Sequence, residues 1–159
     1  MYLKLHNWFN EHSSIAKTVL YVHNIITVYV YLLFVYVNIH LAFQKRFYDL
    51  LLTVLLCGAG FVGVTLLRKI FKRPRPYEIY GYTPILSRNG KGDSFPSRHT
   101  YSVTVIAFAS FQISPYLFVV NAMIALVLGA MRVLGGVHRV SDVVCAYVIA
   151  LLIGIIFLF

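Results

Sequence analysis

The sequence predicts an all-helical integral membrane bundle of about five transmembrane helices, preceded by a short helix at the membrane interface. Of the 159 residues, 60% are hydrophobic and only 12% are charged, against roughly 45–50% and about a quarter in ordinary soluble domains. Four long stretches contain no Lys, Arg, Asp or Glu: residues 18–44, 50–67, 99–131 and 143–159. A soluble fold is disfavoured, because consecutive apolar helices of this kind would leave almost no polar face.

The N-terminal segment, residues 1–14, is too polar to span a membrane. Its apolar side chains can line one side of a short helix that lies at the interface, namely Leu3, Leu5, Trp8 and Phe9. The segment is not a secretory signal, because no apolar core follows its positive start. We therefore expect an interfacial helix here.

Five spans follow from the uncharged stretches, because a spanning helix needs about 20 mostly apolar residues. We predict one span in each of three stretches: 18–44, 50–67 and 143–159. The 33-residue stretch 99–131 is too long for one span, and the polar run Gln112-Ile113-Ser114-Pro115 interrupts its middle. We divide it into spans near 99–113 and 115–131. The whole chain, residues 1–159, is then a single membrane domain.

The charge is unevenly distributed. The formal net charge is +9, and eight of the fourteen basic residues lie in the loop 68–98: Arg68, Lys69, Lys72, Arg73, Arg75, Arg88, Lys91 and Arg98. Loops beside spans are often basic through the positive-inside rule, and anionic lipids attract them. That explanation accounts for part of the charge. Three local patterns, however, indicate phosphate binding or catalysis.

Two of these patterns lie within the long loop. In Arg73-Pro74-Arg75-Pro76, the prolines stiffen the chain and direct guanidinium groups whose planar fork matches phosphate oxygens. In Phe95-Pro96-Ser97-Arg98-His99, the loop re-enters the membrane as the start of a helix. Such a start presents free backbone N–H groups and a positive dipole end to an anion, with His99 at its head.

The third pattern is the connection 132–142, in which His138 and Asp142 are four residues apart. On a helix this spacing places both side chains on one face. The carboxylate can then accept from one ring nitrogen and leave the other as a nucleophile. Gly135-Gly136 is expected to end the preceding helix. An isolated His-x-x-x-Asp motif more often has a structural role. It indicates catalysis here because the other two patterns occur in the same chain.

The count of five spans places the three patterns on one membrane surface. If the chain crosses five times, the loops 68–98 and 132–142 lie on the same side as the N-terminus. The turn near 112–115 and the loop 45–49 lie on the other side.

Together the three segments resemble the signature of the type 2 phosphatidic acid phosphatase superfamily, which reads K-x6-R-P, P-S-G-H and S-R-x5-H-x3-D. The corresponding residues here are Arg68-x6-Arg75-Pro76, Pro96-Ser97-Arg98-His99 and Met131-Arg132-x5-His138-x3-Asp142. Three positions depart from it. Arg68 stands in place of the family lysine, and Lys69 is adjacent. Either residue could therefore take the lysine's role of contacting the phosphate. Arg98 replaces the glycine and Met131 the serine.

The resemblance implies a role for each matched residue. His138 would attack phosphorus to form a phosphohistidine, Asp142 would orient its ring, and His99 would protonate the leaving oxygen and then activate water. The remaining matched side chains would bind the substrate phosphates: Arg68 or Lys69, Arg75, Ser97, Arg98 and Arg132. The clustered cations take the place of a metal, so no cofactor is expected.

The implied function is hydrolysis of a phosphate or diphosphate on a membrane lipid. Undecaprenyl diphosphate is the first choice, followed by lipid A 1-phosphate and phosphatidylglycerophosphate. A lipid phosphotransferase and a non-catalytic protein that binds anionic lipid remain alternatives. The expected partners are the lipid substrate and the bilayer, with no nucleic acid, and the sequence leaves the oligomeric state open.

The expected location is the inner (plasma) membrane, as a multi-pass protein. Basic loops on the N-terminal side point to the cytoplasm, but these charges have a use in binding phosphate. The family resemblance instead favours an active site that faces the periplasm or the outside. The histidines outside the signature, His6, His12, His23 and His40, are not expected to be catalytic.

Overall fold

The computed structural model describes residues 2–86 and 92–159. In this part of the chain every regular element is a helix, as predicted. The elements are α1 (Tyr2–Glu11), α2 (Ser13–Phe43), α3 (Phe47–Phe71), α4 (Pro76–Tyr80), α5 (Arg98–Ala109), α6 (Pro115–Leu134) and α7 (Val140–Gly154), with 3-10 turns at Ser110–Gln112 and Ile155–Leu158. Two of the basic loop residues, Arg88 and Lys91, lie outside the described residues.

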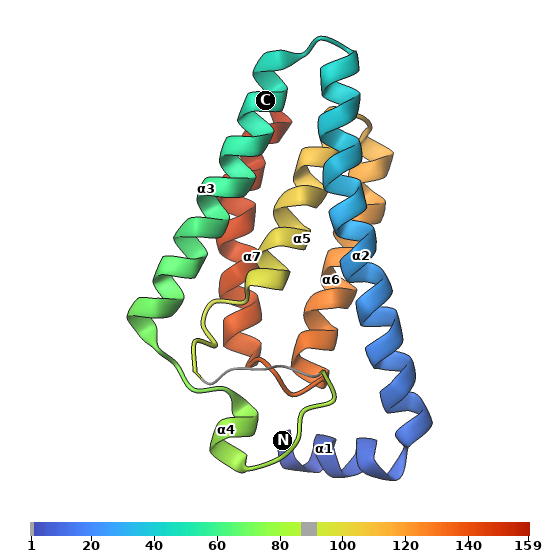
Figure 1. The fold of residues 1–159 in the computed structure, drawn as a ribbon, viewed down its shortest axis with the longest axis vertical. Coiled ribbons are helices and arrows are strands. Elements are labelled where there is room, and N and C mark those ends of the chain that lie inside the picture. The colour runs from blue at the N-terminus through green and yellow to red at the C-terminus, as the bar shows by residue number, and fades with distance from the viewer. Residues whose placement is uncertain (1, 87–91) are drawn as a thin grey trace.

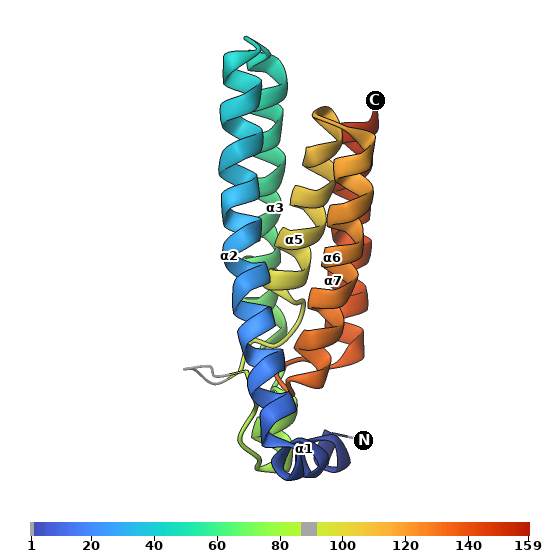
Figure 2. The ribbon, with the colours of Figure 1, turned by 90° about the vertical axis from the view of Figure 1, so that its right-hand side faces the viewer.

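The long helices run side by side, and α5 lies in the middle of them (Figures 1 and 2). One side of the bundle is the hairpin of α2 and α3, and the other is the pair α6 and α7. α1 lies across the lower end beside the short helix α4. The N-terminus is at this lower end and the C-terminus is near the opposite end, as an odd number of crossings requires.

In the described part of the chain, four helical segments are long and apolar enough to cross a membrane: α2, the segment Phe47–Tyr80 that contains α3, α6, and α7 with its 3-10 extension. The fifth predicted span, 99–113, is instead the 12-residue helix α5 followed by a 3-10 turn. A helix of this length rises only about 18 Å, which is less than the roughly 30 Å thickness of the hydrocarbon core. The chain still passes along α5 from the lower to the upper part of the bundle.

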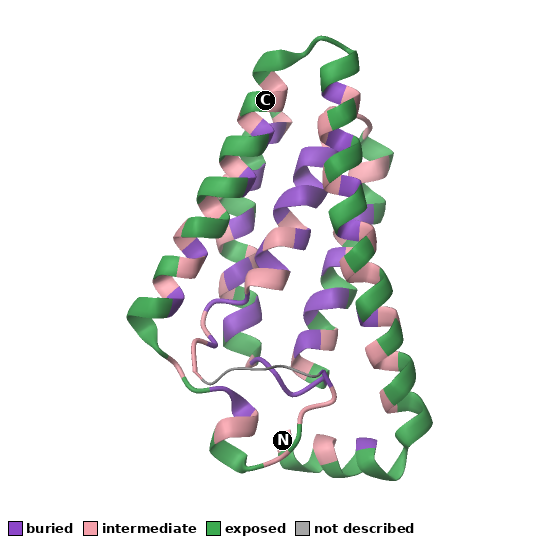
Figure 3. Ribbon diagram, in the orientation of Figure 1, coloured by how far each residue is buried: buried purple, intermediate pink, exposed green. Residues whose placement is uncertain are grey.

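The reason for this difference is that α5 faces other helices and not lipid. It packs against α2, α3, α6 and α7, and most of its residues are buried (Figure 3). Its buried aromatic side chains include Tyr101 and Phe108. A helix shielded in this way does not need a long apolar surface, so its first turn can carry polar and charged residues.

The outer faces of the other helices are apolar and exposed, which fits a protein surrounded by lipid. Large side chains such as Tyr31, Leu32 and Leu152 are more than half exposed, and Figure 3 shows exposed residues along the outer faces of α2 and α3. In α1, Leu3 and Trp8 are exposed while Phe9 is buried against the protein. The predicted N-terminal helix is therefore present.

The predicted interruption of the 99–131 stretch is confirmed. Pro115 is the first residue of α6, where its missing N–H has no cost. The Ser114 side chain caps the same helix by accepting a hydrogen bond from the backbone N–H of Tyr116 at 3.2 Å. Local sequence therefore determines the turn at the end opposite to α1.

A close approach between α3 and α5 depends on Gly60. The Tyr101 side chain is fully buried, and its hydroxyl donates to the Leu56 carbonyl oxygen at 3.2 Å. A Cβ atom at position 60 would lie 1.7 Å from that hydroxyl oxygen. The tyrosine ring is enclosed, so it cannot move aside without displacing its neighbours.

We therefore expect Gly60→Ala to destabilise the folded protein by roughly 1–3 kcal/mol, the usual cost of overpacking. The measurement is the thermal unfolding midpoint of the detergent-purified protein. Gly58→Ala is the matched control on the same helix, because no described atom lies within 4 Å of its added Cβ. That control should be neutral or slightly stabilising, since alanine favours helix. Equal midpoints for the two variants would contradict the packing argument.

Candidate active site

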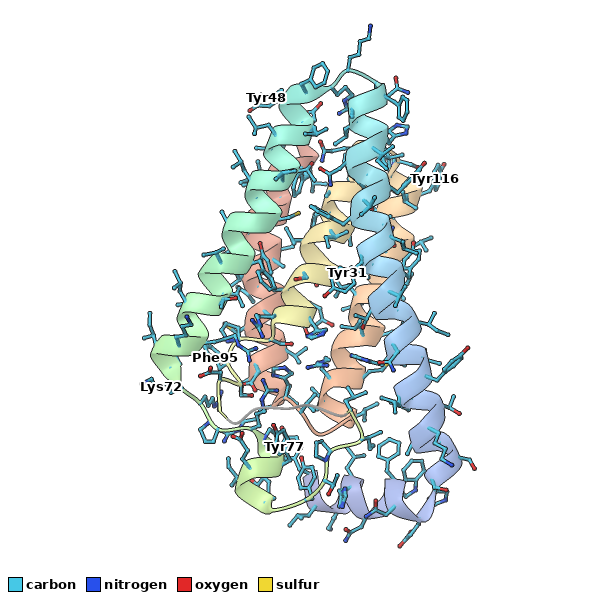
Figure 4. The ribbon with its side chains drawn as sticks, in the orientation of Figure 1. Tyr31, Tyr48, Lys72, Tyr77, Phe95 and Tyr116 are labelled. Atoms are coloured by element: carbon cyan, nitrogen blue, oxygen red, sulfur yellow. The ribbon has the colours of Figure 1, made fainter. Side chains whose placement is uncertain are left out.

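The three sequence patterns meet at the end of the bundle that carries α1, as the alternation of spans predicts (Figure 1). The backbone N–H of Ser97 donates to the Asp142 carbonyl oxygen at 3.0 Å. Arg73 Nη1 donates to the Asp142 carboxylate at 3.1 Å. The same end holds Lys72, Tyr77 and Phe95 in Figure 4. Segments far apart in sequence therefore form one site.

The end of α3 supplies a buried cation. Arg68 is only 3% exposed, and its Nη1 donates to the Pro96 carbonyl oxygen at 3.2 Å. Lys69 is the next residue along the helix, and it is exposed on a different face. Of the two candidates for the family lysine, the structure brings Arg68 to the site and leaves Lys69 outside it.

Arg75 lies fully buried between the two loops. Its guanidinium donates to the carbonyl oxygens of Gly92 and Asp93, each at 3.2 Å, and of Val137 at 2.9 Å. The Glu78 carboxylate accepts from the backbone N–H groups of Arg75 and Gly92, which ties the same loops again. Arg75 thus holds the long loop against the residue that precedes His138.

The beginning of α5 has the predicted form. Ser97 is the N-cap, and its hydroxyl oxygen accepts hydrogen bonds from the Thr100 N–H at 3.4 Å and hydroxyl at 3.0 Å. Arg98 and His99 are the first helical residues. The Arg98 guanidinium lies 5.6 Å from the centre of the Phe61 ring, a cation–π contact with α3.

His138 and Asp142 meet, but His138 precedes α7 and does not lie on it. The helix α6 ends at Leu134, and Gly136 turns the chain with a positive φ of 75°. Asp142 is in the first turn of α7. The His138 Nδ1 atom is 3.5 Å from the Asp142 Oδ2 atom, and both side chains are fully buried. The glycines end the helix as predicted.

Asp142 has further partners, and one of them, Ser94, lies outside all three sequence patterns. The Ser94 hydroxyl donates to its Oδ2 atom, and the Arg139 backbone N–H donates to the same oxygen at 2.9 Å. Arg73 forms the ion pair described above and lies 5.7 Å from the centre of the Phe95 ring. No spacing rule singles out Ser94, which becomes visible only when the loop is folded.

A polar cavity of about 540 Å³ opens beside these residues. Its lining includes Arg98, His99, Arg132 and His23, the last of which comes from α2. His23 Nε2 is 3.1 Å from Arg132 Nη1, and the rings of His23 and His99 are 6.0 Å apart. His23, which was not expected to be catalytic, therefore lines the cavity, because α2 packs close to the start of α5.

An apolar groove of about 200 Å³ adjoins the polar cavity. Thr27, Arg98 and His99 border both spaces. From there the groove runs between α2, α3, α5 and α6, lined by apolar side chains including Tyr31, Phe61, Ile106 and Leu128. The site therefore combines a cationic compartment with an apolar one.

The family model described as the PAP2 superfamily matches residues 46–158. The chain belongs to the PAP2 superfamily. This confirms the resemblance drawn from the motifs, and it makes the chain a membrane lipid phosphatase of the PAP2 type. The match to the family model begins at residue 46, after α2, so His23 lies outside the matched residues.

The fold of this PAP2 protein is similar to that of several solved structures, including the following two. One is a transmembrane PAP2-type phosphatidylglycerolphosphate phosphatase from Bacillus subtilis, with a TM-score of 0.67 and 22% identity over 98% of this chain and 90% of that one. The other is LpxE from Aquifex aeolicus, with a TM-score of 0.67 and 23% identity over 91% of this chain and 93% of that one. No curated protein sequence matches the chain significantly.

The described residues of the PAP2 chain contain no group of three or more His, Cys, Asp or Glu side chains arranged to hold a metal ion. Arg98 and Arg132 line the polar cavity, where they could meet a phosphate. Metal independence itself stays a prediction, to be tested by activity in the presence of a chelator.

The His138 ring has the properties of a neutral nucleophile. Its Nε2 atom is buried and has no hydrogen-bond partner among the described residues. Burial lowers the pKa of His138 to about 3, with the nearby Arg132 and Arg75 acting in the same direction and the Asp142 hydrogen bond opposing them. The ring therefore keeps a lone pair on Nε2 at neutral pH.

We expect the His138 ring to remain neutral when the pH is lowered from 7 to 5. Because its folded pKa lies below the ordinary value of 6.5, protons bind preferentially to the unfolded chain. The contribution of this group to stability is complete above about pH 6.5 and is lost as the pH falls toward 3. NMR titration of ring-labelled histidines measures this, and His138→Gln identifies the signal. Protonation near pH 6.5 would contradict it.

Proposed function

We propose that this protein hydrolyses a lipid diphosphate, with undecaprenyl diphosphate as the first choice, through a covalent phosphohistidine on His138. The Nε2 lone pair attacks the terminal phosphorus, and the bond from phosphorus to the bridging oxygen breaks. His99 gives its proton to that leaving oxygen. Water then attacks the phosphohistidine, His99 takes a proton from it, and inorganic phosphate leaves as the P–N bond breaks.

The arrangement of Asp142 supports this role for His138. The carboxylate lies on the Nδ1 side of the ring, which leaves Nε2 to face the reaction. Ser94 and Arg73 both contact the carboxylate and hold it in place. The buried Nε2 atom, which has no hydrogen-bond partner within residues 2–86 and 92–159, is the observation that carries the proposal.

Positive charge around His138 would stabilise the phosphoryl group during transfer. We assign this work to Arg68, Arg75 and Arg132, assisted by Ser97 and by the backbone N–H groups at the start of α5. Arg132 lines the polar cavity directly. Charges that are fixed before the reaction need no reorganisation when the transition state forms.

The position of Arg98 supports a diphosphate. Arg98 and His99 border both the polar cavity and the apolar groove. A phosphate bound between the scissile group and the lipid tail would lie beside the Arg98 guanidinium. That cation would stabilise the leaving lipid monophosphate, whose charge increases as the bond breaks. The adjoining groove would hold the first part of the apolar chain.

Other substrates and activities follow from the same chemistry. Lipid A 1-phosphate and phosphatidylglycerophosphate remain alternatives, in line with the names of the two solved structures that share the fold. A phosphotransferase would pass the phosphoryl group from His138 to a second lipid instead of water. A non-catalytic lipid-binding protein would not need the buried His138–Asp142 pair.

Phosphate release by the detergent-purified protein, measured in EDTA, tests the proposal. The substrate panel contains undecaprenyl diphosphate, undecaprenyl phosphate, lipid A and phosphatidylglycerophosphate. We expect the diphosphate to be the best substrate. Arg98→Gly restores the family residue, and it should lower kcat/KM for the diphosphate by about tenfold or more while changing the monophosphates little.

His138→Ala is the control for catalysis in the same panel and should release no phosphate above background. A wild-type preference for a monophosphate, or an equal effect of Arg98→Gly on every substrate, would contradict the diphosphate assignment. Loss of activity in EDTA that Mg²⁺ restores would contradict the metal-free mechanism. Phosphate found on a second lipid would identify a phosphotransferase.

We also propose that the site faces the periplasm or the outside of the plasma membrane. The test uses two exposed positions: Thr83, which follows α4, and Gln44, in the turn between α2 and α3 at the opposite end of the bundle. In a chain whose own cysteines are replaced by alanine, Thr83→Cys should react with a membrane-impermeant maleimide in intact spheroplasts. Gln44→Cys should react only after lysis. The reverse pattern would place the site in the cytoplasm.

A further inference from the structure

A histidine outside the family match contacts the site from α2. His23 is only 6% exposed although it lies on a helix whose outer face is largely exposed. It lies 109 residues from Arg132 in sequence, yet its Nε2 atom is 3.1 Å from Arg132 Nη1. Its neighbours along α2, Asn24 and Thr27, line the same polar cavity. Thus α2 contributes a polar face to an otherwise cationic compartment.

The contact determines the tautomer of His23. A guanidinium carries only donors and does not lose its proton, so Arg132 Nη1 donates and His23 Nε2 must accept. The ring proton is therefore on Nδ1, which lies 3.3 Å from the Asn24 side-chain oxygen and donates to it. The ring is neutral in this arrangement. It holds the arginine by a directed hydrogen bond without cancelling its charge.

We propose that His23 is a positioning residue that holds the Arg132 guanidinium in the orientation needed for phosphoryl transfer. This inference rests on the proposed function, in which Arg132 stabilises the transferring group. Arginine has a long side chain with many rotamers, and fixing it before the reaction avoids an entropic cost at the transition state. A hydrogen-bond acceptor at His23 Nε2 is therefore expected to increase kcat and to leave KM nearly unchanged.

The place of His23 in the cavity agrees with this role. Its ring lies 6.0 Å from the ring of His99, and both line the cavity together with Arg98 and Arg132. An apolar residue would fill the same volume at the helix interface, so packing alone does not call for a histidine. What the histidine adds is an acceptor aimed at Arg132.

Two substitutions separate the acceptor from the shape of the ring. His23→Phe keeps a flat ring and removes the acceptor, and His23→Gln keeps an amide oxygen that can accept from Arg132. We expect His23→Phe to lower kcat by about tenfold, the scale of one hydrogen bond to a charged group, with KM nearly unchanged. His23→Gln should stay within about threefold of wild type. His40→Phe, at the far end of the same helix, is the matched control and should leave kcat unchanged.

Inhibition by orthovanadate is a second measurement, because a purely structural role of His23 would not change the affinity for vanadate. Its trigonal-bipyramidal adduct resembles the transition state, so His23→Phe should weaken inhibition by a factor similar to the loss in kcat, whereas His23→Gln should not. Thermal midpoints of all variants are measured in parallel. The inference is overturned if His23→Phe keeps wild-type kcat and vanadate affinity, if both variants lose activity equally, or if only KM rises.

Failure of the proposed function gives a different result. In that case the wild-type protein would release no phosphate from any lipid of the panel. An active wild type together with an unimpaired, folded His23→Phe variant would overturn the inference about His23 alone.

Discussion

The site is built around the carboxylate of Asp142, which is fully buried near the end of a bundle surrounded by lipid. A buried carboxylate is strongly unfavourable unless charged and polar groups compensate it. The partners that do so include Arg73 from the first sequence pattern, His138 and Arg139 from the third, and Ser94, which precedes the second, while Ser97 of the second pattern binds the Asp142 backbone oxygen. The requirement to satisfy one anion therefore brings both loops and the starts of α5 and α7 together.

The form of α5 follows from this requirement. Its first turn must lie beside Asp142, inside the bundle, where Arg98 and His99 line the polar cavity. The helix is consequently short and enclosed by the four long helices, which carry the contact with lipid. Tyr101 and Gly60 show how closely the long helices approach it. Enclosure also lowers the local dielectric, and this strengthens the interaction of fixed charges with a phosphate.

Sequence predicts the parts of this protein that depend on neighbours along the chain. Long uncharged stretches predict α2, α3, α6 and α7, and Pro115 and Gly135 mark helix ends by local backbone chemistry. The length of α5 was not predictable in this way, because it depends on shielding by other helices. Ser94 and His23 were missed for a related reason. Their partners are 48 and 109 residues away, and no spacing rule connects them.

The buried arginines are held in part by neutral hydrogen-bond acceptors. The hydrogen bonds described above for Arg68, Arg75 and Arg132 go to neutral acceptors: the carbonyl oxygens of Pro96, Gly92, Asp93 and Val137, and the ring nitrogen of His23. A neutral acceptor fixes the direction of a guanidinium and does not itself cancel the positive charge. Arg73, by contrast, forms an ion pair with Asp142 and so helps to hold that carboxylate in place. In the proposed function, one short chain thus uses its arginines both to build the site and to bind phosphate in it.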